Sequence, residues 1–237
     1  MTAAWAIFKK ELRVYFTSPL AYMFLGVFLF LAGLFFYLGV VMSGEASLRV
    51  MLGNLSVTLL FLMPMLTMRH FAEERRSGTF ELLMTAPVPL WALLVGKWGA
   101  SLALCVVLLA GTLIFPGILA WYGNPDWGII ATSYLGLFLC CSAFVAAGLF
   151  SSSLSAEPVA GGLGGVMLLL PFWLAGNVAD MVTVDWLRTT LRHVAFLTHI
   201  EPFSKGVIDS GDLLWFVLFT FAFLFLTWRS VESRRWR

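Results

Sequence analysis

Long apolar stretches separated by short polar segments dominate the hydropathy pattern of this chain. The stretches predict membrane-spanning helices at residues 20–42, 50–70, 91–122, 127–151, 158–179 and 212–229. A helix rises about 1.5 Å per residue, so about 20 apolar residues cross a hydrocarbon core of about 30 Å. The last stretch is the shortest between charged residues, but Trp215 and Trp228 flank it as interfacial rings do. The expected fold class is therefore all-α: a polytopic membrane protein with six transmembrane helices in a single domain, residues 1–237.

The segment before the first span, residues 3–17, predicts an amphipathic helix. Its apolar side chains share one face at helical periodicity, and they are Trp5, Phe8, Leu12, Tyr15 and Phe16. Lys10, Glu11 and Arg13 fall elsewhere around the helix. Helices of this kind lie along a membrane surface, so we expect an N-terminal interfacial helix on the inner leaflet. The alternative is a frayed cytoplasmic tail.

Residues 180–205 carry too many charges to cross a bilayer. Apolar residues recur there at helical spacing, at Val184, Leu187, Leu191 and Val194. Asp185, Arg188 and Arg192 lie between them. We therefore expect an extracytoplasmic amphipathic helical segment on the outer surface.

Two glycines of the fifth span, Gly161 and Gly165, lie four residues apart. This spacing of small residues lets helices approach closely, so the pair predicts helix packing. Packing within one chain and contact with a second copy fit the pattern equally well.

Composition agrees with a membrane protein. Hydrophobic residues make up 60% of the chain and charged residues 12%, whereas soluble domains carry about 25% charge. The net charge of +2 gives no reason to expect nucleic acid as a partner. The three cysteines, Cys105, Cys140 and Cys141, lie in apolar stretches, and we expect them to be reduced packing residues.

The positions of Lys and Arg predict the orientation. With both termini in the cytoplasm, only four of the 15 Lys and Arg fall outside: Arg49, Arg188, Arg192 and Lys205. An excess of positive charge on the cytoplasmic side is the usual bias of membrane proteins. We therefore expect a multi-pass protein of the bacterial inner membrane.

No motif for catalysis is present. Gly96-Lys97 is followed by Trp98, so it does not complete a phosphate-binding G-x-x-x-x-G-K-[ST] loop, and zinc-protease and nucleophile-elbow motifs are also missing. The predicted topology separates the histidines, His70, His193 and His199, between the two surfaces, so we expect no metal site. Ion-driven carriers keep charged groups at membrane depth, and we expect none in these spans. The chain is therefore predicted to be neither an enzyme nor a secondary carrier.

The loop after the second span, residues 71–86, combines charged and apolar residues. It predicts a helix that emerges from the membrane, a turn at Ser77-Gly78, and a second short helix from Thr79 that ends before Pro87. The apolar residues of that second helix need an interface or a protein groove to bury them. A solvated charged loop is the alternative.

At these residues the sequence resembles the type-2 ABC permease family, particularly the branch that includes the gliding-motility permease. Residues 72–88, A-E-E-R-R-S-G-T-F-E-L-L-M-T-A-P-V, match an element that follows the second span in that branch. Residues 199–209, H-I-E-P-F-S-K-G-V-I-D, match a second element before the last span. The number of spans and the K-K-E-L at residues 9–12 also fit, so the resemblance covers nearly the whole chain.

The resemblance implies a complex of two permease protomers, identical or related, with a cytoplasmic ABC ATPase dimer. ATP and Mg²⁺ would bind to the ATPase, and this chain would hold no cofactor. The loop would form a coupling helix that docks on the ATPase through Phe71, Glu73, Glu74, Arg75, Arg76, Ser77, Gly78, Thr79, Phe80 and Glu81. The chain, as the permease subunit, would couple ATP hydrolysis by the ATPase to movement of a substrate across or within the membrane.

The resemblance also implies partners outside the cytoplasm. The family often has companion proteins with an outer soluble domain, which would dock on residues 177–211. An alternative function is therefore mechanical: the membrane subunit drives an extracytoplasmic partner without translocating a substrate. Membrane lipid is the remaining expected partner, and the sequence does not identify a substrate.

Overall fold

The computed structural model describes residues 3–43, 47–79, 88–123 and 125–234. Every regular element in these residues is an α-helix. In chain order they are α1 (Ala3–Thr17), α2 (Pro19–Ser43), α3 (Arg49–Thr67), α4 (Arg69–Arg76), α6 (Leu90–Thr112), α7 (Ile114–Tyr122), α8 (Trp127–Leu154), α9 (Pro158–Met181), α10 (Asp185–Val194), α11 (Phe196–Ser204) and α12 (Ser210–Arg234).

Six helices in the described part of the chain are long and apolar enough to cross a membrane, which confirms the predicted all-α polytopic fold. They are Pro19–Val41, Arg49–Arg76, Leu90–Tyr122, Trp127–Leu154, Pro158–Met181 and Ser210–Ser233. The last is 24 residues long, so it is no shorter than an ordinary span. The second and third runs are each interrupted once, at Met68 and at Leu113.

Helix α8 forms the centre of the bundle, where it packs against α3, α6, α9, α11 and α12. The reason lies in its small residues: residues 140–149, C-C-S-A-F-V-A-A-G-L, are all buried. A Cβ at Gly136 would lie 2.9 Å from Cβ of Phe203, and one at Gly148 would collide with Thr67. Small side chains therefore let the neighbouring backbones approach α8 closely.

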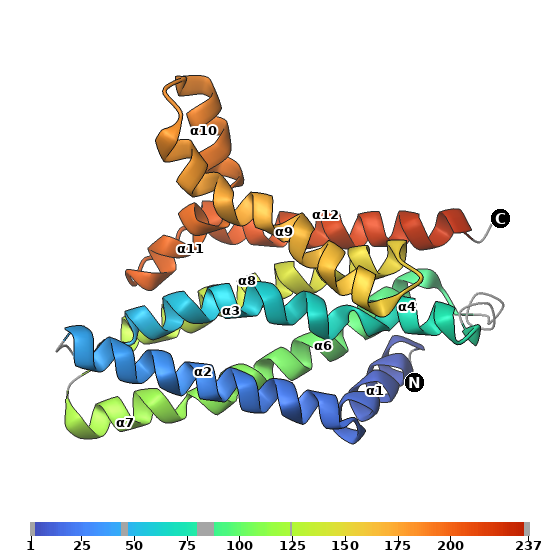
Figure 1. Ribbon diagram of the computed structural model, residues 1–237, viewed down its shortest axis with the longest axis horizontal. Coiled ribbons are helices and arrows are strands. Elements are labelled where there is room, and N and C mark those ends of the chain that lie inside the picture. The colour runs from blue at the N-terminus through green and yellow to red at the C-terminus, as the bar shows by residue number, and fades with distance from the viewer. Residues whose placement is uncertain (1–2, 44–46, 80–87, 124, 235–237) are drawn as a thin grey trace.

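The two ends of the bundle differ. Figure 1 shows the N-terminus, the C-terminus and α4 at one end, which we call the α4 end. At the other end, the last part of α9 and α10 pack against each other and project away from the remaining helices. We call this the α10 end. An even number of crossings places both termini at the same end.

The cysteine prediction is wrong for two of the three residues. Cys105 of α6 and Cys141 of α8 are joined in a disulfide, whereas Cys140 is a free, buried thiol. The contact depends on the packing of α6 on α8, with the two Cα atoms 6.7 Å apart. Nothing in the spacing of the cysteines reveals which spans are neighbours.

The two glycines of the fifth span pack inside the chain. Both are buried: a Cβ at Gly165 would lie 2.8 Å from Cβ of Pro64, and one at Gly161 would lie 3.3 Å from Cα of Ser152. They therefore bring α9 against α3 and α8 of the same chain.

The segment 180–205 forms two helices, α10 and α11, and not one continuous surface helix. The chain breaks at Ala195, where Phe196 enters the core and contacts Phe144 and Trp215. No residue of α10 is buried, whereas α11 packs on α8 and α12. Burial of Phe196 and Phe203 anchors one side of α11 to the bundle, and its other residues are partly or fully exposed. The location of both helices on the outer surface stays a prediction.

Candidate functional site

A charged side chain lies buried inside the third span, at the α4 end. Only 1% of Lys97 in α6 is exposed. Its Nζ donates to Oε1 of Glu74 at 2.7 Å, to the carbonyl oxygen of His70 at 2.8 Å and to Oε1 of Glu11 at 3.2 Å. Burial of an ammonium group is costly unless all its donors find partners, and here three acceptors meet three N–H groups. Lys97 thus joins α6 to α1 and to α4.

A glycine beside Lys97 makes this arrangement possible. A Cβ at Gly96 would lie 2.8 Å from Cγ2 of Ile7 and 3.0 Å from the carbonyl oxygen of Ala4. Without a side chain at this position, α1 lies directly against α6. The close contact carries Glu11 of α1 to the ammonium of Lys97.

Three further polar side chains extend the cluster. Nε2 of His70 lies 2.7 Å from the Tyr15 hydroxyl and 2.7 Å from Oγ of Ser101, and the two hydroxyls are 3.1 Å apart. Nδ1 of His70 faces Oε2 of Glu11 at 3.6 Å. We call the six residues Glu11, Tyr15, His70, Glu74, Lys97 and Ser101 the Lys97 network. It connects α1, α4 and α6.

The electrostatics of α1 reflect this network. Burial acts to raise the pKa of Glu11, but the His70 ring and the Lys97 ammonium together hold the pKa far below its usual value. Burial also acts to lower the pKa of Lys10, and its neighbours Glu11 and Glu74 raise it overall. Burial raises the pKa of the Tyr15 hydroxyl. Glu11 is therefore a carboxylate and Tyr15 a neutral phenol at neutral pH.

Helix α8 fixes the junction between α3 and α4. The hydroxyl of Ser152, which is fully buried, donates to the carbonyl oxygen of Met68 at 2.8 Å and accepts from the backbone N–H groups of Phe71 at 3.1 Å and Ala72 at 3.3 Å. A side chain that inserts into a helical ladder in this way breaks or bends the helix. The insertion explains why α3 ends and α4 begins at Met68. Nearby, the Arg75 guanidinium donates to the carbonyl oxygen of Ser155.

The predicted coupling residues divide into two groups. Phe71 is buried, Glu74 lies in the Lys97 network, and Arg75 faces α8. The second group is exposed and comprises Glu73, Arg76, Ser77, Gly78 and Thr79. Helix α4 therefore has one face packed against the other helices and one exposed face.

The predicted turn at Ser77-Gly78 is present, and Gly78 has a φ of 72°. This left-handed conformation suits glycine, which has no Cβ. Phe80 and Glu81, with the rest of the predicted second short helix, lie outside the described residues.

Most of the network differs from what the sequence predicts. No charge is expected within the spans, yet Lys97 lies inside α6, and His70, predicted to be a surface residue, is only 5% exposed. Glu11 is expected away from the apolar face of its helix, yet it is buried. A lone Lys within an otherwise apolar run was the available signal, because such a charge requires partners.

The second sequence element, residues 199–209, lies at the α10 end and has a packing role. Nδ1 of His199 lies 2.6 Å from Oδ1 of Asp212, and Phe203 packs against Gly136. Gly206 has a φ of 86°. These contacts hold α11 against α8 and α12, far from the Lys97 network.

Hydrogen bonds and ion pairs make up the Lys97 network. No group of His, Cys, Asp and Glu suited to a metal ion occurs within the described ranges. The network instead fixes the positions of three helices relative to one another. Lys97 thus links α4 to α1 and α6, and Ser152 links α4 to α8.

Comparisons with known proteins agree with a membrane transport role. Residues 5–207 match the sequence profile described as ABC-2 family transporter protein. The probable multidrug ABC transporter permease YbhR of Escherichia coli strain K12 is 28% identical over 150 residues, which cover 61% of this chain and 40% of the relative. The YbhR protein of strain O157:H7 matches to the same extent. The aligned region thus spans well under half the length of these relatives.

Proposed function

Since the chain belongs to the ABC-2 family of transporter proteins, we propose that it is the membrane permease subunit of an ATP-binding-cassette transporter. Within the family we assign it to the gliding-motility-type branch, on the two elements at residues 72–88 and 199–209. Two permease protomers, identical or related, combine with a cytoplasmic ATPase dimer that binds ATP and Mg²⁺. The complex lies in the bacterial inner membrane with both permease termini in the cytoplasm.

The observation that carries the coupling proposal is the division of α4 into two faces. Its inner face is tied to the bundle by the Lys97 network and by Ser152. Its outer face, with the turn that follows, presents Glu73, Arg76 and Thr79 to the surroundings. We propose that the outer face docks on the ATPase, and that the inner face passes the movement of the ATPase to the spans.

The route of this movement follows the contacts. A shift of α4 moves Glu74, and Lys97 is held by Glu74 and Glu11 at the same time. Helices α1 and α6 therefore respond together. Ser152 provides the second route, to the central helix α8. Networks of hydrogen bonds and ion pairs between rigid helices are among the contacts that carry coupling between sites.

A labelling experiment tests the orientation and the partner. Thr79→Cys in the full chain is expected to react with a membrane-impermeant thiol reagent only from the cytoplasmic side, and the candidate ATPase is expected to protect it. Val184→Cys, an exposed position in the connection before α10, is the matched control and is expected to react only from the opposite side. Labelling of Thr79→Cys from the outside contradicts the proposal, because α4 would then be out of reach of the ATPase.

A second candidate function is mechanical transmission to an extracytoplasmic partner. It is favoured by α10, which projects from the bundle without a single buried residue and exposes Trp186 at 71%. Reconstitution with the ATPase in liposomes separates the two functions. A permease moves solute or lipid as ATP is hydrolysed, whereas a mechanical subunit supports hydrolysis without such movement.

A further inference from the structure

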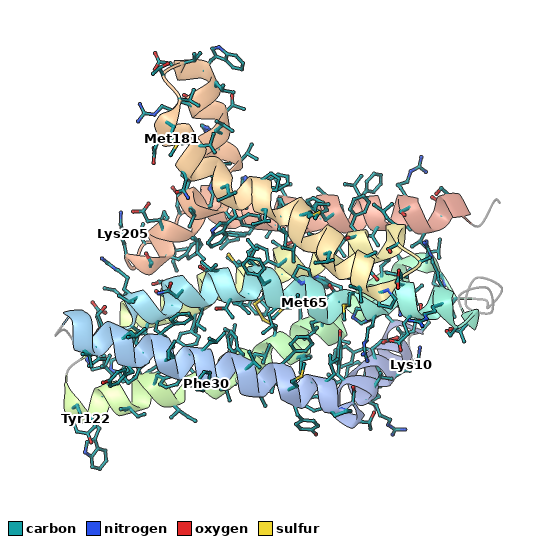
Figure 2. All side chains as sticks on the ribbon, viewed as in Figure 1. Lys10, Phe30, Met65, Tyr122, Met181 and Lys205 are labelled. Atoms are coloured by element: carbon teal, nitrogen blue, oxygen red, sulfur yellow. A yellow bond between two sulfur atoms is a disulfide. The ribbon has the colours of Figure 1, made fainter. Side chains whose placement is uncertain are left out.

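A cavity of about 590 Å³ lies at the α10 end of the chain. Its walls come from α3, α8, α9, α10 and α11, which are far apart in the sequence. The volume is in the range of small-molecule sites, about 300–1,000 Å³. In Figure 2 this end carries Met181, on the projecting part of α9, whereas Lys10 marks the opposite, α4 end. The cavity is therefore separate from the Lys97 network.

The floor of the cavity is apolar. Leu52, Leu137 and Phe203 line it, and each is at most 5% exposed. Two serines also line it, but their hydroxyls are already engaged: Ser56 donates to a carbonyl of its own helix and Ser133 to the carbonyl of Phe203. A ligand group on this floor therefore gains mainly from apolar contact, since the O–H donors of both serines are already used.

The rim of the cavity carries both signs of charge. Nη2 of Arg192 in α10 lies 2.9 Å from Oδ1 of Asp180 in α9, and both side chains are about half exposed or more. A guanidinium has five N–H donors, so this contact leaves others free to bind an anion. Glu201 of α11 lines the same cavity, and its carboxylate is paired with Lys205 outside the lining.

Two neutral polar side chains complete the rim. The Asn177 carboxamide and the Thr198 hydroxyl line the cavity and make no side-chain hydrogen bond to any other residue that the structure describes. Their donors and acceptors are available to a polar group of a ligand. The lining thus changes from an apolar floor to a rim that carries two neutral polar groups and charges of both signs.

We propose that this cavity binds a single-chain zwitterionic amphiphile of the phospholipid type. The alkyl chain lies on Leu52 and Leu137, the phosphate binds Arg192, and the amine of the head group faces Glu201. A purely anionic head group would meet the carboxylates of Asp180 and Glu201, and a purely cationic one would leave the donors of Arg192 unused. The proposal concerns the chain alone and does not depend on its coupling to an ATPase.

Photolabelling in nanodiscs tests the proposal. The probe is a lysophosphatidylcholine with a photoreactive group in its chain, incubated with the full-length protein. We expect saturable labelling of the α3 and α8 segments that form the floor. Unlabelled dodecylphosphocholine should compete at least tenfold better than dodecyltrimethylammonium or dodecyl phosphate. Labelling without saturation, or equal competition by the cation or the anion, overturns the proposal.

Two variants and their controls locate the site. Gly53→Trp fills the cavity, and a Cβ at Gly53 meets nothing within 4 Å, so we expect loss of the saturable labelling. Gly117→Trp is the control, since a Cβ there also meets nothing within 4 Å and the residue lies in α7, outside the lining. Unchanged labelling of Gly53→Trp overturns the proposal.

The second variant addresses the head group. Arg192→Gln removes a charge-assisted contact, so we expect dodecylphosphocholine to compete about tenfold less well. Arg188→Gln is the control, because Arg188 is exposed on the same helix and does not line the cavity. Equal competition in Arg192→Gln and the unsubstituted protein overturns the assignment. The ATPase is absent from these measurements, so their failure leaves the proposed coupling function unaffected.

Discussion

Oε1 of Glu74 lies 2.7 Å from Nζ of Lys97, which joins the short helix after the second span to the buried start of the third. The same ammonium contacts Glu11 of α1, so one cation holds two carboxylates from different helices. The arrangement makes the position of α4 dependent on the positions of α1 and α6. It also predicts how the chain responds when single members are removed.

Replacement of Lys97 by Met keeps an unbranched side chain, one atom shorter, and removes the charge. Glu11 and Glu74 then lose their buried partner, and we expect the chain to be destabilised by about 3–5 kcal/mol. Thermal unfolding of the purified protein in detergent measures the change. Lys205→Met, which breaks an exposed pair, is the control and should cost about 1 kcal/mol or less. Adding Glu11→Gln and Glu74→Gln to Lys97→Met should restore part of the loss; a Lys97→Met protein as stable as the control contradicts the role of the network.

Replacement of Gly96 by Ala tests the contact between α1 and α6. The new Cβ would overlap Ile7 and approach the carbonyl of Ala4, so we expect α1 to shift and stability to fall by about 1–3 kcal/mol. Limited proteolysis within residues 3–17 should become faster. Gly26→Ala is the matched control, because a Cβ there meets nothing within 4 Å. If both variants behave alike, close packing at Gly96 does not hold α1 in place.

Replacement of Ser152 by Ala removes the hydroxyl at the junction of α3 and α4. The N–H groups of Phe71 and Ala72 lose their acceptor, at an expected cost of about 1–3 kcal/mol. Hydrogen exchange at these two amides of α4 should accelerate relative to the amides of α3 and α8. Ser204→Ala removes a hydroxyl that bonds only to its own helix and should change little. Unchanged exchange at Phe71 and Ala72 would show that Ser152 does not fix the junction.

The lowered pKa of Glu11 predicts a specific dependence of stability on pH. Its ordinary value is 4.5 and its folded value is much lower, so the ionised carboxylate stabilises the fold fully above about pH 4.5. The stabilisation is lost as pH falls from 4.5 toward the folded value. The difference in unfolding temperature between the unsubstituted chain and Glu11→Gln should therefore be constant from about pH 8 to 5 and shrink below that. A difference that stays constant down to pH 3 contradicts an ionised, paired Glu11.

Much of the fold could be predicted because lipid imposes a simple rule. Spans must be long, apolar and helical, and the six apolar stretches satisfy that rule without knowledge of their neighbours. The turn at Gly78 was also predictable, because it depends only on residues adjacent in the sequence. The Cys105–Cys141 disulfide and the entry of Phe196 into the core depend instead on which helices are adjacent. Hydropathy along the chain does not contain that information.

The candidate site was predictable only on its outer face. Charges at Glu73 and Arg76 beside a glycine turn indicated an exposed segment, and the structure places them on the surface. The inner face depends on Lys97, which precedes a long uncharged stretch and resembled an ordinary charge at the membrane boundary. Its burial follows from the approach of α1, which Gly96 permits. A single sequence shows each of these residues but not their convergence.

The most direct test of coupling measures ATP hydrolysis by the partner ATPase with the permease in liposomes. The charges on the outer face of α4 are exchanged in the variant Glu73→Arg with Arg76→Glu, and the matched control exchanges Asp185→Arg with Arg188→Asp, two exposed positions of α10 at the same spacing and outside the cavity lining. We predict that the α4 variant loses at least tenfold of the permease-stimulated hydrolysis, whereas the control retains it. Full stimulation by the α4 variant would contradict the proposal that this face is docked on the ATPase.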